Sequence, residues 1–164
     1  MPDKKKMGTT IAEFLKAKSF AVVGVSANRR KFGNVVFRAM RDRGLSVAPV
    51  HKTLNVVEGE KCYRSVQELP GKVEAVVTVI PPAETEQVVQ ECAEAGIKRI
   101  WMQPGSNSDR ALALAQEKGM EVVTGECLLM FLEPVRSVHK VHRWIKKIAG
   151  RYPTPAATWP CRVS

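Results

Sequence analysis

The segment FAVVGVSANRRKFG, residues 20–33, combines apolar, small and basic residues in an order that suits phosphate binding. A short apolar run ends in Gly24, a polar loop follows, and a helical pattern begins at Gly33. A turn from a strand into a helix binds phosphates because backbone N–H groups and the positive end of the helix dipole converge there. The basic residues 29–31 add charge within the loop. We expect a nucleotide-type cofactor with several phosphates here; the alternative is an ordinary first turn whose basic residues are only solvated.

The cysteines and histidines indicate no catalytic or metal centre. Cys62, Cys92, Cys127 and Cys161 are far apart, with no C-x-x-C pair and no histidine at ligand spacing, which argues against zinc. We expect reduced thiols, with Cys92 in the core. Cys127 follows a predicted strand and either packs the end of the sheet or faces a cofactor thiol, with which it would form a mixed disulfide. The three histidines do not cluster by spacing, so we expect no enzyme activity.

Composition and charge limit the remaining classes of protein. The chain has 164 residues, 45% hydrophobic and 26% charged, which is typical of one globular domain. No apolar run approaches the ~20 residues of a membrane span, and the start lacks the apolar core of a secretory signal, so we expect a cytoplasmic protein. The net charge of +10 is concentrated at the two ends of the chain. Nucleic-acid or acidic-protein binding through these termini is therefore an alternative function.

A pattern of amphipathic helix, glycine and strand repeats three times and predicts the elements that position the loop. The helices are expected at 33–43, 83–95 and 108–118, each followed by a glycine that suits a helix C-terminus. Apolar strands alternating with such helices predict a parallel sheet covered on both faces, an α/β, three-layer, Rossmann-like doubly wound fold. The five expected strands are 20–25, 45–50, 75–80, 97–102 and 120–123.

The ends of the chain differ from this core. Residues 1–8 are expected to be a disordered basic segment, and Thr10 and Glu13 predict a capping box that opens a short helix ending near Lys18. The cofactor domain is expected over 9–135, and an amphipathic basic helix over 136–150, whose apolar stripe would dock on the domain or on a second copy of the chain. Residues 151–164 read as a proline-rich tail.

Ligands of doubly wound sheets bind at the carboxyl ends of the strands, and the loops there disfavour NAD. The spacing of Gly24 and Gly33 does not fit G-x-G-x-x-G. His51 and Lys52 follow the second strand, where an acid would hold the ribose hydroxyl of NAD. Basic residues favour a ribose that bears a phosphate, as in NADP or coenzyme A. NADP chemistry would normally need a second, substrate-binding domain, although an NAD(P)-binding regulatory module is kept as an alternative.

Several motifs together resemble the small stand-alone CoA-binding proteins. The motifs are VVGVSANRRKFGN, SVAPV, EGEKCYRS, VVTVIPP, AGIKRIWMQPG and the cysteine after VVTG, and they follow the family's order from about Ile11 to Phe131. These proteins are similar to the N-terminal CoA-binding domain of the succinyl-CoA ligase α subunit. The resemblance implies a Rossmann-like domain that binds coenzyme A or an acyl-CoA without catalysis of its own.

The resemblance also implies which residues contact the cofactor. The first turn and Lys31 would meet the phosphates, the end of the second strand would lie near the nucleotide, and the later loops would close the far side. Two departures are His51 and Lys52 where the family has Asn-Pro, and Gly125 and Glu126 where it tends to have a basic residue. The complete set of expected cofactor-binding residues is Gly24, Val25, Ser26, Lys31, Pro49, Val50, His51, Lys52, Ile80, Pro81, Pro82, Gln103, Gly105 and Cys127.

Overall fold

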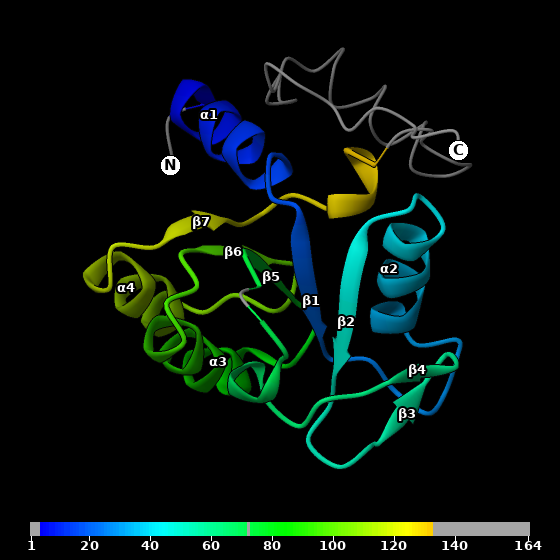
Figure 1. Ribbon diagram of the computed structural model, residues 1–164. Helices are drawn as coiled ribbons and strands as arrows, with labels where there is room; N and C mark the ends of the chain where they lie inside the picture. Colours follow the sequence, from blue (N-terminus) through cyan, green and yellow to red (C-terminus); the bar gives the residue numbers. More distant parts are fainter. Residues whose placement is uncertain (1–3, 72, 133–164) are drawn as a thin grey trace.

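Five parallel strands form a single sheet with helices on both faces (Figure 1). A computed structural model of the chain describes residues 4–71 and 73–132. In chain order the strands are β1 Ser19–Val23, β2 Ser46–Val50, β5 Ala75–Thr78, β6 Arg99–Met102 and β7 Glu121–Val123, and they lie in the order β2-β1-β5-β6-β7. The predicted five-stranded parallel sheet is therefore confirmed.

Side chains alternate between two hydrophobic cores, as the pleat of a strand requires. Phe20 and Val22 of β1 join the core beneath α1 Lys4–Leu15 and α2 Phe32–Arg41. Ala21 and Val23 join the core beneath α3 Pro82–Glu94 and α4 Asp109–Glu117. Both faces of the sheet are thus covered, which confirms the three-layer arrangement.

The ends of the central helices follow the expected local rules. Ser108 caps α4, its hydroxyl accepting a hydrogen bond from the Ala111 N–H at 3.1 Å. The glycines that follow α2, α3 and α4 (Gly44, Gly96 and Gly119) have φ angles of 73°, 74° and 67°. The predicted glycine termini are therefore confirmed.

The N-terminal helix differs from the prediction. It begins at Lys4 instead of near Thr10 and ends at Leu15 instead of near Lys18, so residues 4–8 are helical where we expected disorder. The predicted capping box is wrong because Thr10 lies inside the helix, and the Glu13 carboxylate pairs instead with the Lys16 ammonium at 2.6 Å.

A short hairpin and two short 3-10 helices were not predicted. The hairpin consists of β3 Val56–Val57 and β4 Glu60–Lys61, antiparallel and separate from the main sheet. The 3-10 helices are η1 Val66–Glu68 and η2 Leu128–Met130. Strands of two residues are too short to leave a periodic pattern in the sequence.

Aromatic side chains join the two ends of the described chain. The buried Trp101 ring of β6 meets the Phe14 ring of α1 edge-on, with centroids 5.2 Å apart, and the Phe131 ring beyond η2 at 5.5 Å. Its indole N–H donates to the Glu126 carbonyl at 2.8 Å. Residues from both ends therefore complete the same core.

The predicted basic helix at 136–150 and the proline-rich tail at 151–164 lie outside the described residues. Among the described helices, none is both long and apolar enough to cross a membrane.

The strand order creates a crevice at one edge of the sheet. From β1 the chain passes through α2 to β2 on one side, and it then returns to β5 on the other side of β1. In doubly wound sheets ligands bind outside the carboxyl ends of the strands where the order reverses in this way. That place is the carboxyl end of β1 and β5.

Candidate functional site

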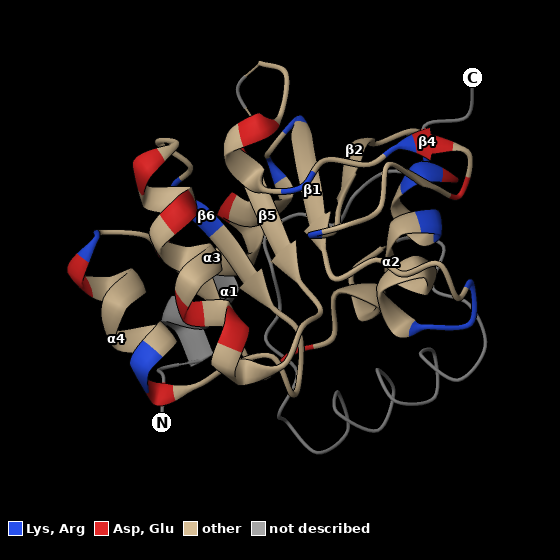
Figure 2. Cartoon of the chain, turned by 90° about the horizontal axis from the view of Figure 1, so that it is seen from below, with Lys and Arg blue, Asp and Glu red and all other residues tan. Residues whose placement is uncertain are grey.

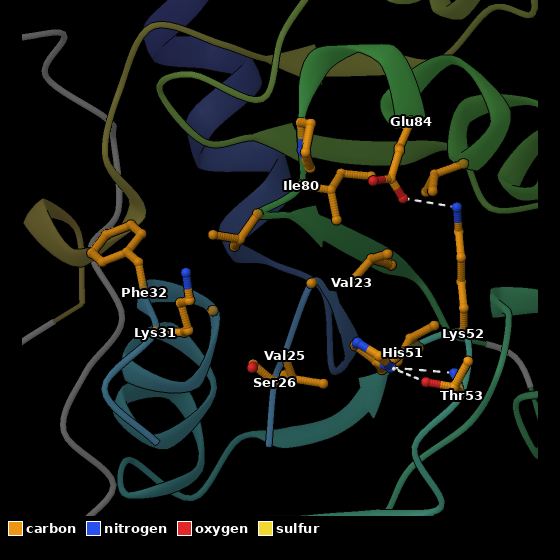
Figure 3. Close-up of a pocket in the computed structure, with 16 residues that line it drawn as sticks. Val23, Val25, Ser26, Lys31, Phe32, His51, Lys52, Thr53, Ile80 and Glu84 are labelled. Atoms are coloured by element: carbon orange, nitrogen blue, oxygen red, sulfur yellow. Dashed lines mark hydrogen bonds and ion pairs between the residues drawn. The ribbon is translucent and has the colours of Figure 1, made fainter. Parts of the chain in front are cut away.

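A cavity of about 600 Å³ opens at the carboxyl ends of β1 and β5 (Figure 3). This volume is within the range typical of sites for small molecules and cofactors. Nine of the residues predicted from the sequence line it. They are Gly24, Val25, Ser26 and Lys31 from the first loop, Val50, His51 and Lys52 from the end of β2, and Ile80 and Pro81 from the loop after β5.

The other five predicted residues do not line this cavity. Pro49 is buried within β2, where it pairs with Val22 of β1. Pro82 is the exposed first residue of α3. Gln103, Gly105 and Cys127 follow β6 and β7, further along the same edge of the sheet.

The cavity also has lining residues that the sequence did not single out. The main ones are Phe32, Thr53, Glu84 and Val88. Phe32 is the first residue of α2 and 41% exposed, and Glu84 is in the first turn of α3. The sequence could have identified Phe32 and Glu84, because they lie in the first helical turns after the loops that contain Lys31 and Pro81. Residues in such a turn face the same crevice as the loop.

Two glycines let the backbone segments around the cavity approach closely. Gly24 has a φ of 109°, and a Cβ there would overlap the Val79 carbonyl. A Cβ on Gly33 would in turn overlap the Gly24 carbonyl. Any side chain at either position would push the α2 N-terminus or the loop after β5 away from the end of β1.

The N-terminus of α2 provides N–H donors at the edge of the cavity. The amides of its first residues, Phe32 and Gly33, have no acceptor within the helix, since the first turn of a helix cannot supply one. The first turn holds no acid, and Lys31 occupies the N-cap without a capping side-chain bond. This end of the helix is therefore electropositive and suited to an anion.

Asn34 fixes the loop that precedes α2. Its side chain is fully buried, its Oδ1 accepts from the Ser26 N–H at 2.7 Å, and its Nδ2 donates to the Ser26 carbonyl at 2.8 Å. Both polar atoms of the Asn34 side chain thus hydrogen-bond to the backbone of Ser26, a residue that lines the cavity. The loop is preorganised, so a ligand does not have to order it.

A buried carboxylate from the β3–β4 hairpin holds the same region. The Glu58 side chain is only 1% exposed, and its oxygens accept from Asn34 Nδ2 at 3.0 Å, Arg38 at 2.6 Å and Arg29 at 3.0 Å. The hydrogen bond from Asn34, followed by those two guanidinium groups, lowers the pKa of Glu58 although burial opposes the shift. Arg29 is therefore engaged by Glu58, which leaves Arg30 and Lys31 as the loop cations without a carboxylate partner among the described residues.

The walls of the cleft differ in charge (Figure 2). Helix α2 and the loop before it contain Arg29, Arg30, Lys31, Arg38 and Arg41 and no acid. Helix α3 carries Glu84, Glu86, Glu91 and Glu94 and no Lys or Arg. The field across the crevice therefore directs an anion toward the α2 side.

The loop after β6 is held by a buried hydroxyl network. Ser106 Oγ donates to Thr78 Oγ1 at 3.0 Å, and Thr85 Oγ1 donates to the Ser106 carbonyl at 2.5 Å. Gln103 is 1% exposed and its Oε1 accepts from the Leu128 N–H at 3.4 Å, whereas its Nε2 has no hydrogen-bond partner. Gln103 thus contacts the segment after β7, and it presents a buried donor near Cys127.

The thiols and the histidine of the described part show no catalytic arrangement. Burial raises the pKa of Cys92 to about 12, so this core thiol stays protonated, in agreement with the predicted core role. The His51 ring accepts from the Thr53 N–H through Nδ1 at 3.2 Å. No cluster of three metal-ligating side chains occurs within residues 4–71 and 73–132.

The parallel sheet with its crevice at the order reversal defines a Rossmann-like protein. Residues 18–133 match the family described as the CoA binding domain, and the chain belongs to that family.

Known relatives include both short proteins and parts of larger enzymes. The α subunit of an ADP-forming acetate–CoA ligase from Pyrococcus furiosus is 29% identical over 70% of this chain, which spans only 28% of that subunit. An uncharacterized protein of Bacillus subtilis is 28% identical, with 69% of this chain and 84% of that protein aligned. A solved structure of a conserved hypothetical protein from Pyrococcus furiosus has a TM-score of 0.65 and 40% identity, covering 68% of this chain and 96% of the other.

Proposed function

We propose that this chain binds coenzyme A or an acyl-CoA in the cleft at the ends of β1 and β5, and that it catalyses no reaction by itself. The observation that carries the proposal is the electropositive α2 N-terminus, held against the end of β1 by Gly24 and Gly33. Membership of the CoA-binding family supports the choice of ligand.

The diphosphate of the cofactor is assigned to the α2 N-terminus. The N–H groups of Phe32 and Gly33 and the Lys31 ammonium would contact it, and Asn34 and Glu58 would keep this loop in place. The adenosine end would lie toward His51 and Lys52, and the pantetheine arm would run past Ile80 and Pro81. Gln103, Gly105 and Cys127 would then lie near the thiol end.

The length of the pantetheine arm is compatible with a cofactor that runs from β1 toward β7. Three strand spacings separate β1 from β7, which is roughly 14 Å. The arm has about twelve backbone bonds, and twelve bonds of extended chain, like four residues, span roughly 13–14 Å. A diphosphate at β1 is therefore compatible with a thiol near Cys127.

The residues that line the cleft support binding without catalysis. The histidine among them, His51, hydrogen-bonds to Thr53 and not to a nucleophile. Such a lining can hold and orient a ligand, whereas acyl or phosphoryl transfer needs a nucleophile or base aimed at the reacting atom.

Thermal unfolding with a ligand series tests the proposal. Coenzyme A well above its dissociation constant should stabilise the protein by roughly 2–4 kcal/mol, and NAD should not. NADP and dephospho-CoA complete the series. Stabilisation by NAD without stabilisation by coenzyme A would favour the NAD(P)-binding regulatory module instead.

A further inference from the structure

A pocket of about 470 Å³ lies between α2, the loop before it and the β3–β4 hairpin. The loop contributes Ser26, Ala27 and Arg29, helix α2 contributes Asn34 and Arg41, and the hairpin contributes residues 56–59. Ser26 also lines the cleft, whereas the other lining residues belong to this pocket and not to the cleft. The pocket is therefore a separate cavity beside the cleft, and the proposed function assigns it no ligand.

The turn of the hairpin is built around one carboxylate. Glu58 and Gly59 form the two-residue turn between β3 and β4, with φ angles of 52° and 81°. Positive φ at both turn positions suits glycine and asparagine, so a glutamate there costs backbone strain. The buried Glu58 carboxylate offsets this cost through its bonds with Asn34, Arg38 and Arg29. These bonds fix the hairpin beside the loop before α2 (Figure 1), so the pocket between them is preformed.

Two arginines that line the pocket keep N–H donors for a ligand. Arg41 donates through one terminal nitrogen to the Glu58 carbonyl at 2.9 Å, and Arg29 donates through Nε to the Glu58 carboxylate at 3.0 Å. Within the described residues, the second terminal nitrogen of Arg41 and both terminal nitrogens of Arg29 have no hydrogen-bond acceptor. Both guanidinium groups are therefore positioned by Glu58 and remain available to an anion.

The charges around the pocket sum to a positive potential. Among the described residues that line it, Arg29 and Arg41 are the bases and Glu58 is the acid. Both oxygens of Glu58 are already paired with guanidinium groups, so its charge is neutralised. Asp42 lies 3.8 Å from Arg41 Nε, but it is exposed and outside the lining, and the acid and base at 60–61 are both exposed and cancel. An anion that enters the pocket therefore meets more positive than negative charge.

We propose that this pocket binds a small phosphate monoester, with its phosphate on Arg29 and Arg41 and its organic part against Val56. Guanidinium groups match pairs of phosphate oxygens. A monoester carries about 1.5 to 2 negative charges at neutral pH, against one for a carboxylate, so it is the better competitor with Glu58 for Arg29. Val56 is 64% exposed and provides an uncovered apolar wall. No covalent bond changes on binding.

NMR titration of the isotopically labelled full chain tests the proposal, because amide shifts locate weak binding residue by residue. The probes are phenyl phosphate, inorganic phosphate and benzoate. Phenyl phosphate should shift the Val57 and Gly59 amides in a saturable way. Inorganic phosphate lacks the apolar part and benzoate carries a single charge, so each should bind about threefold more weakly or worse.

Three variants test the residues of the pocket. Arg41→Gln should weaken phenyl phosphate binding about tenfold, through the loss of a charge-assisted hydrogen bond. Val56→Asp leaves every arginine in place and adds a repelling charge to the apolar wall, so it should weaken binding about fivefold. Arg30→Gln is the matched control, because it removes an exposed cation of the same loop that lines neither cavity, and it should change the affinity less than about twofold. Melting temperatures verify that each variant folds.

The opposite results would overturn the proposal. Shifts confined to Phe32 and Gly33, at the cleft, would show that the phosphate has no second site. Equal affinities for phenyl phosphate and benzoate would refute the choice of a phosphate. An unchanged affinity in Arg41→Gln or in Val56→Asp would exclude this pocket as the site. None of these results depends on whether coenzyme A binds in the cleft, so the proposed function and this inference stand or fall independently.

Discussion

The two walls of the cleft are built in opposite ways. On the α2 side, Asn34 and Glu58 are buried and form hydrogen bonds of 2.6–3.0 Å with the loop, with each other and with Arg38. On the α3 side, the polar group at the cleft is the exposed Lys52–Glu84 ion pair. Buried, charge-assisted bonds hold a fixed geometry, whereas exposed pairs exchange partners easily.

The contrast indicates that the two walls have different roles in binding. The diphosphate, which coenzyme A shares with NAD and NADP, suits the fixed α2 wall because a rigid set of donors needs no reorganisation. The exposed ion pair on the α3 side can change partners when a ligand enters the cleft.

The largest loss of stability is expected from a substitution at Gly24, where the end of β1 lies against the loop after β5. Gly24→Ala places a Cβ against the Val79 carbonyl at a φ of 109° and should lower the free energy of unfolding by about 3 kcal/mol or more. Urea denaturation measures the loss. Gly105→Ala is the control: its φ is 87° but a Cβ there meets nothing within 4 Å, so only the backbone cost of about 1 kcal/mol applies. Equal losses would contradict the close approach at Gly24.

A smaller loss of stability is expected when only the hydrogen bonds of the α2 wall are weakened. Glu58→Gln removes the carboxylate that binds Arg29 and Arg38 and should destabilise the protein by about 2 kcal/mol in urea denaturation. Glu121→Gln, which breaks the more exposed ion pair with Arg99, should cost about 0.5 kcal/mol or less. Similar values for the two variants would mean that burial of Glu58 is not what makes the α2 wall rigid.

The pH dependence of stability should reveal the contribution of the Glu58 carboxylate to the free energy of unfolding. The folded pKa of Glu58 is lowered, so its contribution is fully present above the unfolded value of about 4.3 and is lost as the pH falls through the folded pKa. Acidification from about pH 5 to pH 3 should therefore destabilise the unaltered protein more than Glu58→Gln. Parallel stability curves for the two proteins over this range would refute the assignment.

The smallest effect is expected for a single loop cation. Lys31→Ala should leave the melting temperature unchanged, because the side chain is exposed, and should weaken coenzyme A binding about fivefold at low salt and less at high salt. Lys118→Ala, at the far end of α4, is the charge-matched control. A loss that does not depend on salt would assign Lys31 a role other than phosphate attraction.

Local signals in the sequence predicted the sheet and part of the cleft. The apolar strands and the glycines after three helices are short-range patterns, and the strand order brings their loops together at one edge. Nine cavity-lining residues were predicted because they lie at a strand end or in a strand-end loop and because the family resemblance singles out the same loops.

The remaining features depend on contacts between distant segments. Glu58 lies 29 residues from Arg29 and 24 from Asn34, and the two-residue strands on either side of it leave no period to detect. Arg29 was therefore counted among the charges of the phosphate-binding loop, although Glu58 engages it. The pairing of Lys52 with Glu84 likewise requires knowing which helix faces the end of β2.

The Trp101 cluster determines when this protein can finish folding during its synthesis. Its ring needs Phe14, which is made early, and Phe131, which is made 117 residues later. The face of the sheet covered by α1 therefore stays open until the ribosome has released nearly all of the described chain. Until then the apolar side of α1 has no complete core to enter, and apolar surface exposed in this way favours aggregation.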